Sequence, residues 1–397
     1  MERWQAMILR LAFKNIIHNG YRSLVNIVVV SIVLIIMVWT QAMYYSWIRL
    51  AENQQKDWEY GKGMLRVKTY DPYDPLSYED SHAPIPEELR SGVEQGDLLP
   101  VLLAPATIYP QGRMLSAIIK GIPAEQDILV FPSDKLSAQQ SDIIPVLIGS
   151  AMAKSTRLDQ GDIFSIRVRD VNGAYNAVDA IVQEVLPIPA PSADMGTIWM
   201  NLDLMRDLRG APHSASYFVL GDSRYQDTHT RDFRFIDRDE YFADLDQMLD
   251  NERFQQVLMY ALLVFLAMIA IFDTQALAVF KRRKEIGTLA ALGFTKAKII
   301  LLFTLEGSIY TLLAIIATPI LGFPLFYYFS TAGFPVIDGY DEFGLPGFTE
   351  PIKFIYPIYE ILIVFLVILL FTIFVSWLPT RKIAKMNPVD ALRNKVD

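Results

Sequence analysis

The chain has 397 residues, 52% of them hydrophobic, and a mean hydropathy of +0.26. Soluble proteins of this length seldom average so apolar, so the composition argues against an ordinary soluble enzyme and indicates membrane spans. The absence of cysteine excludes disulfides, thiol catalysis and thiolate metal sites. The formal net charge of −8 averages acidic and basic segments of the chain.

Residues 1–22 are basic and amphipathic, with Leu9, Phe13 and Ile16 near one helical face. They predict a helix lying on the cytoplasmic membrane surface, with a frayed terminus as the alternative.

Four apolar runs are each long enough to cross a bilayer, which takes about 20 residues. We predict transmembrane helices over 23–48, 256–280, 299–323 and 355–378. The first has a charged lead-in and no small-residue cleavage site, so it is expected to be an uncleaved anchor. A set of buried core helices is the alternative, but four such lengths in one chain argue against it.

Residues 49–255 hold 33 acidic and 20 basic residues and alternate β-type runs with helical pieces. They predict a mixed α+β domain of two lobes. We expect strands at Met64–Thr69, Ser116–Lys120, Ile163–Arg169, Ala177–Val185, Thr197–Asn201 and Tyr217–Leu220, and helices at Ser150–Leu158 and Leu202–Arg209. Two helical stalks should frame the domain, one through Ala51–Tyr60 and one over Arg238–Gln256 that runs without a break into the second span.

The distribution of charge along the chain predicts which side of the membrane each segment occupies. Residues 1–22, 281–298 and 379–397 are basic and are expected on the cytoplasmic side, because positive residues favour that side. The acidic segment 49–255 and the glycine- and proline-containing loop 324–354 then lie outside. The fold class predicted is an α-helical membrane protein of four transmembrane helices, with an extracytoplasmic mixed α+β domain between helices 1 and 2.

The spans carry two acidic residues, Asp273 and Glu306. A carboxylate in lipid is costly and usually has a purpose. One interpretation is a proton or ion relay. The favoured one is helix-to-helix bonding near the cytoplasmic face, through Thr274, Gln275, Thr304 or Ser308. Pro319 and Gly322 predict a kink in the third span.

Residues 281–298 are the most informative segment. An apolar patch with basic flanks predicts a short helix along the membrane, over Lys284–Phe294, and Gly293 predicts a stop before a new helix starts. A plain basic loop is the alternative. The patch consists of Ile286, Leu289, Ala290, Leu292 and Gly293.

Catalytic motifs are absent from the sequence, including the phosphate-binding loop of ATPases, so no catalytic residue is assigned. The four histidines are scattered; His82 lies near Glu79 and Asp80, but a solvated loop is favoured over a metal site. No metal site, no cofactor and no nucleic-acid partner are expected in this chain.

Three segments of the sequence resemble those of a known protein family. The run KRRKEIGTLAALGFTKAKIILLFTLEG is similar to the signature loop of FtsX-like permeases, the membrane subunits of type VII ABC transporters. The matching positions are Arg283, Glu285, Ile286, Gly287, Leu289, Ala291, Leu292, Gly293, Glu306 and Gly307. The tail PTRKIAKMNPVDALR resembles the closing motif through Pro379, Arg381, Ala384, Pro388, Ala391, Leu392 and Arg393, and LAFKNIIHNGYRSLV resembles the opening helix.

The resemblance implies a location and a set of partners. The chain would sit in the bacterial inner membrane, with both termini cytoplasmic and the large domain periplasmic. A separate ABC ATPase dimer, which binds ATP and Mg²⁺, would dock on the short cytoplasmic helix. A second permease subunit, identical or paralogous, would complete the transporter. The docking residues would be Arg283, Lys284, Glu285, Ile286, Gly287, Leu289, Ala291, Leu292, Gly293 and Phe294.

The branch of the family decides the substrate. The segments VLIGSAMAKSTRLDQGD and AIIKGIPAEQD resemble the macrolide-exporter and lipoprotein-releasing branches. We favour release of lipoproteins or other amphipathic substrates, with a periplasmic carrier or adaptor as a further partner. Tripartite-type efflux and regulation of a cell-wall hydrolase are the alternatives. Tryptophans and tyrosines of the outer region suit either an acyl-binding groove or a packed core.

Overall fold

The structure is a computed structural model, which describes residues 20–71, 74, 77–137, 143–226, 228–335 and 351–383. The chain divides into two compact units, which we call the helical unit and the sheet domain. The helical unit consists of Met1–Trp47, Met248–Phe334 and Ile352–Asp397, and the sheet domain of Ile48–Gln247 and Pro335–Pro351.

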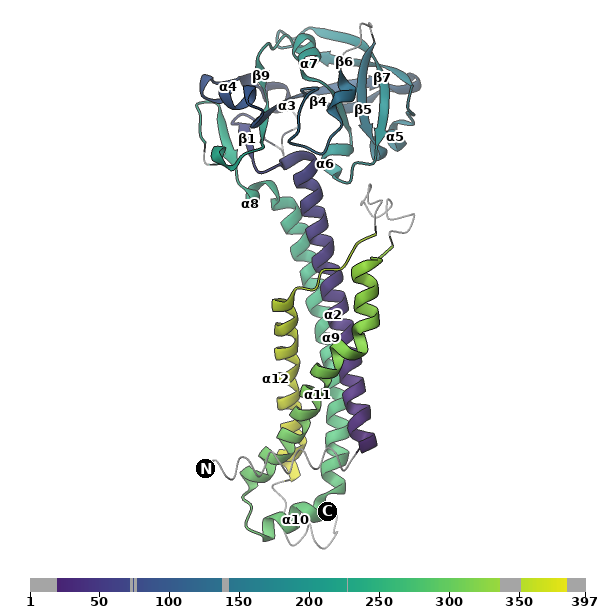
Figure 1. Ribbon diagram of the computed structural model, residues 1–397, viewed down its shortest axis with the longest axis vertical. Coiled ribbons are helices and arrows are strands. Elements are labelled where there is room, and N and C mark those ends of the chain that lie inside the picture. The colour runs from purple at the N-terminus through teal and green to yellow at the C-terminus, as the bar shows by residue number, and fades with distance from the viewer. Residues whose placement is uncertain are drawn as a thin grey trace. The chain divides into compact units, whose positions relative to one another are not determined.

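Four long helices form the helical unit (Figure 1). They are α2 (Gly20–Gln55), α9 (Ala243–Lys281), α11 (Lys296–Thr331) and α12 (Ile358–Ile383), with the short helix α10 (Arg283–Ala291) between α9 and α11. Each long helix contains a stretch apolar and long enough to cross a membrane, with mean hydropathies from 2.1 to 3.1. Helices long and apolar enough to cross a membrane are therefore present at all four predicted positions.

The helix ends differ from those predicted. α11 contains Pro319 and Pro324 and continues to Thr331, so the first residues of the predicted loop 324–354 are helical. A proline removes a single backbone hydrogen bond, and a long apolar helix packed on its neighbours tolerates that loss. α12 reaches Ile383, into the predicted tail 379–397. The predicted surface helix 1–22 falls almost wholly outside the described residues, as does the tail beyond 383.

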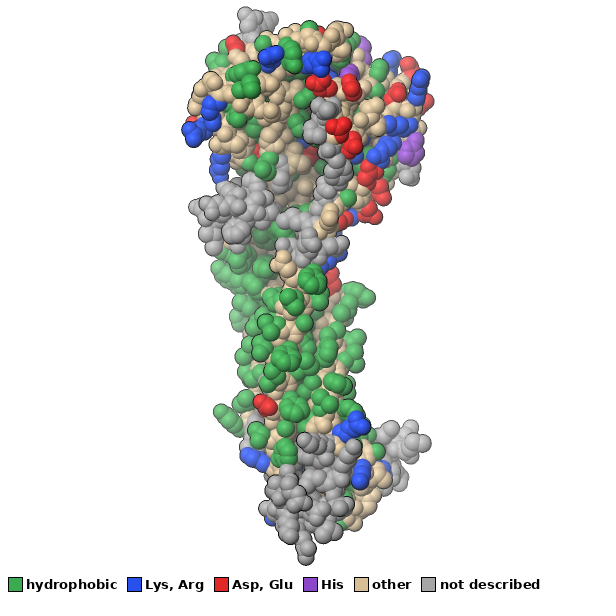
Figure 2. Space-filling model, turned by 180° about the vertical axis from the view of Figure 1, so that it is seen from behind, with side chains coloured by type: hydrophobic (Ala, Val, Ile, Leu, Met, Phe, Trp, Pro, Cys, Tyr) green, Lys and Arg blue, Asp and Glu red, His purple; other side chains and the backbone are tan. Residues whose placement is uncertain are grey.

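All four long helices contribute to one apolar core. Val30 and Leu34 of α2, Val264 of α9, Ala314 of α11 and Ile368 of α12 are among its buried members. Hydrophobic side chains also cover the outer face of these helices (Figure 2). Apolar residues on both the inside and the outside are what helices surrounded by lipid require.

The sheet domain is built on nine strands with the order β11-β1-β10-β3-β4-β8-β5-β7-β6. The strands are β1 (Met64–Val67), β3 (Leu98–Tyr109), β4 (Leu115–Ile122), β5 (Ile144–Gly149), β6 (Ile163–Arg169), β7 (Tyr175–Leu186), β8 (Thr197–Asn201), β10 (Tyr217–Leu220) and β11 (Phe233–Ile236). A separate pair joins β2 (Ala83–Pro84) to β9 (Ser214–Ala215). The helices are α3 (Ser77–Asp80), α4 (Glu87–Glu94), α5 (Ser150–Thr156), α6 (Pro191–Asp194), α7 (Leu202–Arg209) and α8 (Arg238–Tyr241).

Strand β3 belongs to two parts of this sheet. Its first residues pair with β10, and its later residues pair with β4 on one side and β6 on the other. The second set of pairings closes β3, β4, β8, β5, β7 and β6 into a barrel, which removes their free edges. Ile119, Val146 and Ile166 fill its interior and are fully buried. The domain is one compact unit, so the predicted two lobes are not separate bodies.

All six strands predicted from short β-type runs are present. β2, β9 and β11 were not predicted, and neither were the longer strands β3 and β5. Both are almost entirely buried, with continuous apolar sequences and no alternation. A strand covered on both faces lacks the period of two that identifies a half-exposed strand. Prolines inside both runs, Pro100 and Pro105 in β3 and Pro145 in β5, weaken the strand signal further.

The two predicted stalks differ in outcome. After α2 the chain continues as a π-helical turn, Lys56–Tyr60, so helical structure reaches Tyr60 as predicted. The other stalk is interrupted, because α8 ends at Tyr241 and α9 begins at Ala243. Phe242 between them is fully buried, and its ring lies 5.5 Å from that of Tyr60. The helix is interrupted at Phe242 because the ring of this residue is buried in the sheet domain. The prediction of an unbroken stalk is therefore wrong.

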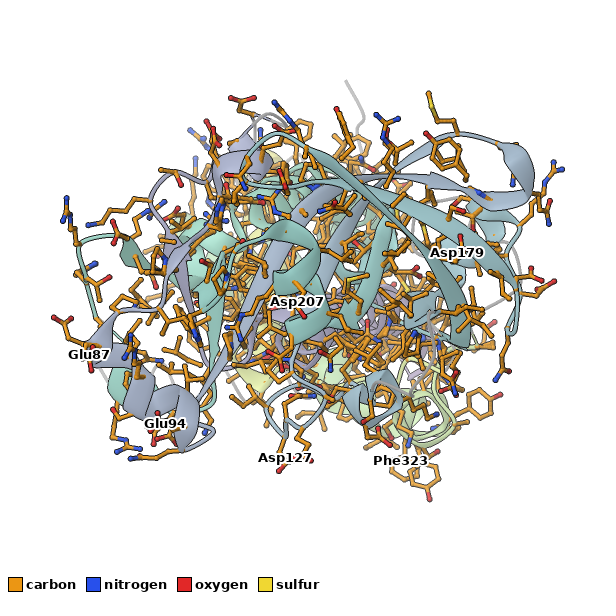
Figure 3. The ribbon with its side chains drawn as sticks, turned by 90° about the horizontal axis from the view of Figure 1, so that it is seen from above. Glu87, Glu94, Asp127, Asp179, Asp207 and Phe323 are labelled. Carbon is orange, nitrogen blue, oxygen red and sulfur yellow. The ribbon has the colours of Figure 1, made fainter. Side chains whose placement is uncertain are left out.

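Acidic side chains project from the sheet domain in the view of Figure 3. They include Glu87 and Glu94 of α4, Asp179 of β7 and Asp207 of α7, all of them exposed. This accords with the acidic composition of the domain and with a solvated surface.

Candidate coupling site

Helix α10 is short and is defined at both ends. Arg282 precedes it with non-helical backbone angles, and it ends at Ala291. Gly293 then adopts a φ of 91°, a left-handed conformation that glycine adopts without strain. Thr295 is extended, and α11 starts at Lys296. The predicted helix stop and restart are confirmed.

One face of α10 packs against α11 of the same chain. Ile286 is 6% exposed and clusters with Ile299 and Phe303 of α11. Leu289 packs against Leu302 of α11, and Phe294 after the helix joins the first cluster. Most of the apolar patch predicted from sequence is therefore occupied by the chain itself, because these residues hold α10 on α11.

A buried ion pair reinforces this packing. The guanidinium Nη1 of Arg282 lies 3.0 Å from Oε2 of Glu306, and the side chain of Glu306 is 3% exposed. Arg282 also donates from Nε to Oε2 of Glu285 at 2.6 Å, and its guanidinium lies 5.0 Å from the ring centre of Phe303. Arg282 thus joins the first turn of α10 to the third turn of α11.

The charges of Arg282 and Glu306 stabilise each other. Burial alone would lower the pKa of Arg282, but the neighbouring carboxylates of Glu306 and Glu285 outweigh it and raise the pKa. The guanidinium accordingly stays charged and neutralises a carboxylate that would otherwise be buried alone.

Sequence reasoning identified Glu306 but missed its partner. Arg282 stands in a run of four basic residues, Lys281–Lys284, which resembles an ordinary positive-inside loop. Nothing in that run distinguishes Arg282, which turns back toward α11. The predicted bonding through Thr304 and Ser308 is not what the structure shows, because Ser308 donates to the carbonyl of Thr304 in its own helix.

The opposite face of α10 is exposed and largely polar. Lys284 and Thr288 are exposed, Glu285 is 59% exposed, and Leu292 at the end is 73% exposed. Ala291 and Gly293 are also exposed, while Gly287 is buried. This surface, Lys284, Glu285, Thr288, Ala291 and Leu292, is called the exposed face of α10 below.

The other predicted site residues fall elsewhere. Asp273 is exposed on α9. Arg283 is the first residue of α10, but its side chain is not described, and neither are those of Thr274 and Gln275. Pro388 and Arg393 lie outside the described residues.

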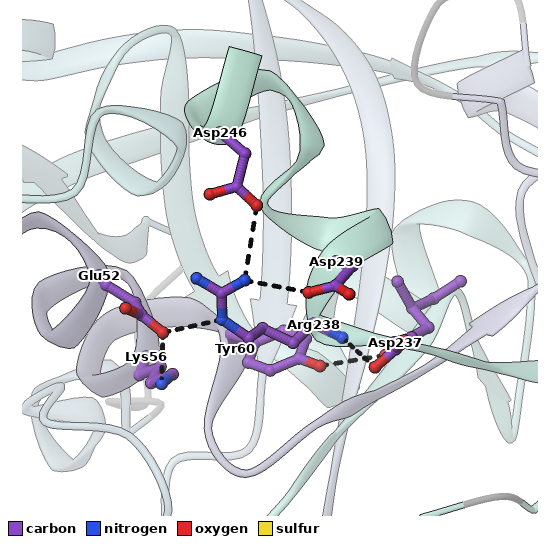
Figure 4. A network of polar contacts seen from close by, with 8 residues as sticks. Glu52, Lys56, Tyr60, Asp237, Arg238, Asp239 and Asp246 are labelled. Carbon is purple, nitrogen blue, oxygen red and sulfur yellow. Dashed lines mark hydrogen bonds and ion pairs between the residues drawn. The ribbon is translucent and has the colours of Figure 1, made fainter. Parts of the chain in front are cut away.

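A second polar cluster joins the end of α2 to α8 and the first residues of α9, all within the sheet domain (Figure 4). Nε of Arg238 donates to Glu52 at 3.0 Å, and Lys56 pairs with the same carboxylate at 2.8 Å. Arg238 also reaches Asp239 and Asp246. Burial would raise the pKa of Glu52, but the hydrogen bonds and charges of Arg238 and Lys56 lower it.

Among the described residues, no group of three or more histidines, aspartates and glutamates is placed to hold a metal ion. His82 donates its backbone N–H to Asp80, and burial is the main cause that lowers the pKa of its imidazole.

The segment that contains α10 is similar to a known protein family. Residues 257–388 match the family described as FtsX-like permease C-terminal. No curated protein matches the chain. Among solved structures, the extracellular domain of the noncanonic ABC-type transporter YknZ from Gram-positive bacteria aligns with 11% identity, over 44% of this chain and 99% of its own, at a TM-score of 0.27, which is too low to support an argument.

The family match runs from α9 through α10 and α11 and beyond α12, so it includes the whole coupling site. It confirms the resemblance that residues Arg283–Gly307 carry in the sequence. Residues 257–388 of this chain accordingly belong to the FtsX-like permease C-terminal family.

Proposed function

We propose that this chain is the permease subunit of an ABC transporter that couples ATP hydrolysis by a separate ATPase dimer to movement of the sheet domain. The observation that carries the proposal is the two-sided α10. One face is bound to α11 through Ile286 and the Arg282–Glu306 pair, and the exposed face is available to a partner.

This arrangement suits the transfer of force. A helix held only by a loop would yield when a partner pushed on it, whereas α10 is joined to α11 by both apolar packing and a buried charge pair. A shift of α10 would then displace α11 and the helices that share its core. Packed helices move as discrete bodies, which lets a small displacement at one end be transmitted.

The partner is proposed to be an ATPase that receives the exposed face in a groove, as amphipathic helices are received elsewhere. The exposed apolar side chain of Leu292, beside Lys284 and Glu285, is suited to such a groove. A second permease subunit, ATP and Mg²⁺ would belong to the assembled transporter.

For the substrate we propose a lipoprotein or another amphipathic molecule acted on at the outer face of the membrane. The tryptophans of the sheet domain do not support an acyl-binding groove, because Trp199 is fully buried and Trp58 packs on Phe131. The alternatives to this substrate class are small-molecule efflux and regulation of a hydrolase. The proteins that bind the complex distinguish the three functions.

The test is purification of the tagged chain from its native membrane in mild detergent, with mass spectrometry of the proteins bound to it. The Leu292→Asp variant is expected to lower recovery of the ATPase about tenfold, as loss of a central interface side chain does. Leu292→Met, of similar volume, is the matched control and should retain it.

Undiminished ATPase binding by folded Leu292→Asp would contradict the docking role of the exposed face. Bound lipoproteins would support the substrate class, whereas an adaptor and outer-membrane channel would indicate efflux, and a cell-wall hydrolase would indicate regulation.

A further inference from the structure

The π-helical turn that follows α2 contains a buried glutamate. Glu59 lies in Lys56–Tyr60 and is 7% exposed. π-Helical turns are rare and occur frequently at functional sites. The turn changes the direction in which side chains leave the helix, and here it directs a carboxylate into the sheet domain.

Glu59 is held by groups from other parts of the sheet domain. Its Oε1 pairs with Nζ of Lys120 on β4, a barrel strand. Its Oε2 accepts a hydrogen bond from the hydroxyl of Ser192 on α6. Tyr241 of α8 also bonds to it. One carboxylate thus links the end of α2 to three further elements.

Lys120 is itself fixed within the barrel. It is 6% exposed, and its Nζ also donates to the carbonyl of Ser192 at 3.0 Å. The same atom lies 5.1 Å from the ring centre of Trp199, which is opposite Lys120 in the β4–β8 register. Burial would raise the pKa of Glu59, but Lys120 and its hydrogen bonds outweigh it and lower the pKa.

Exposure distinguishes this pair from the cluster of Figure 4. The side chains of Lys120 and Glu59 are 7% and 10% exposed, whereas that of Arg238 is 42% exposed. Exposed pairs are screened and easily rearranged, and a buried pair resists separation because each charge would be left without a partner. Hydrophobic contacts are non-directional and allow sliding, which a charge pair in one geometry does not.

We propose that Glu59 is the positioning residue through which movement of α2 reaches the barrel, by way of Lys120. The inference rests on the proposed function and names the contact in this chain that would carry its motion. The pair holds the π-helical turn after α2 to β4, so a displacement of that turn displaces the barrel with it.

The test compares nucleotide-dependent hydrogen exchange in the full chain with its ATPase in lipid nanodiscs, with and without ATP and vanadate. Peptides of α2 report the helix, and peptides of β4 and β5 report the barrel. The neutral variant Glu59→Gln with Lys120→Met removes both charges and leaves neither buried alone. We expect the α2 response to remain and the barrel response to fall about tenfold, a coupling loss within the range measured for such residues.

Two further variants are compared with the neutral one. The reversed pair, Glu59→Lys with Lys120→Glu, should restore the barrel response. The matched control is Lys135→Met with Glu184→Gln, the same exchanges at an ion pair between residues 133–136 and β7, and it should leave both responses unchanged.

A barrel response of normal size in the folded neutral variant would overturn the inference and leave the proposed function intact. Absence of any nucleotide response in wild-type α2 would instead contradict the proposed function. If the neutral variant does not fold, Ser192→Ala decides, because Ser192 is exposed and its loss is tolerable. The barrel response is expected to fall about twofold, because Glu59 loses one hydrogen bond and keeps its contact with Lys120. An unchanged barrel response would refute the role of Glu59.

Discussion

The carboxylate of Glu306 and the guanidinium of Arg282 form a buried pair at the base of α11. Such pairs add little net stability when complete, but removing one partner leaves a charge with no compensation. Their value here is geometric, because the pair fixes the distance between the start of α10 and α11. Glu285, on the exposed face, binds Nε of the same guanidinium and so links the contact surface to the buried charge.

The first prediction concerns this pair. Arg282→Ala should destabilise the helical unit by about 3 kcal/mol, because Glu306 is left buried without its cation. Arg282→Met combined with Glu306→Gln removes both charges and should recover most of the loss. Thermal unfolding of the chain in detergent measures both variants, and equal melting temperatures for Arg282→Ala and the wild type would contradict the pairing.

At the scale of single residues, the sequence identified the acidic member of the pair because a carboxylate in an apolar run is conspicuous. It did not identify Arg282, whose neighbours Lys281 and Lys284 have the same charge. Which cation of a basic run turns toward a buried acid depends on how α10 leaves α9, and no local signal encodes that.

At the scale of elements, the turn between α10 and α11 depends on Gly293. Its φ of 91° lies in the region that side chains rarely adopt, and a Cβ there would meet no atom within 4 Å. A substitution is therefore costly through backbone conformation alone and not through a clash.

The second prediction follows from that conformation. Gly293→Val should cost about 1–2 kcal/mol, since a β-branched residue is strongly disfavoured in the left-handed region. The turn should relax and reorient α10, so ATP hydrolysis stimulated by the permease should fall. Gly293→Asn is the control, because asparagine adopts this region more readily. Equal ATPase stimulation in the valine and asparagine variants would argue against a role for the turn.

The elements that were predicted correctly have strong local signals. The six predicted strands, the four long apolar helices and the stop at Gly293 follow from β propensity, hydropathy and backbone preference, respectively. Strands β3 and β5 lack such a signal because both of their faces are buried. The helix is interrupted at Phe242 because the ring of this residue is buried. These failures share one cause: tertiary packing overrides the local pattern.

At the scale of the whole molecule, the orientation of the chain rests on the distribution of charge. The segments 281–298 and 49–255 differ in sign, and the positive one is expected in the cytoplasm. The third prediction tests this directly. The chain has no cysteine, so a single introduced cysteine reports one position without a background.

Tyr175→Cys, at a side chain 60% exposed on β7, should react with a membrane-impermeant maleimide in intact spheroplasts. Thr288→Cys, on the exposed face of α10, should react only after the membrane is permeabilised. Labelling of both in intact spheroplasts, or the reverse order, would show that the predicted orientation is wrong.

The sequence by itself determined the properties that depend on composition along the chain. These are four helices long and apolar enough to cross a membrane, the sign of the charge on each segment, and the short helix that ends before Gly293. Hydropathy, charge and backbone preference act locally, so one sequence reveals them. The tertiary structure alone decided the closure of the barrel by β3 and β6, the partnership of Arg282 with Glu306, and the packing of Ile286 and Leu289 against α11. Each of these depends on residues far apart in the chain, whose meeting is set by the packing of the whole fold.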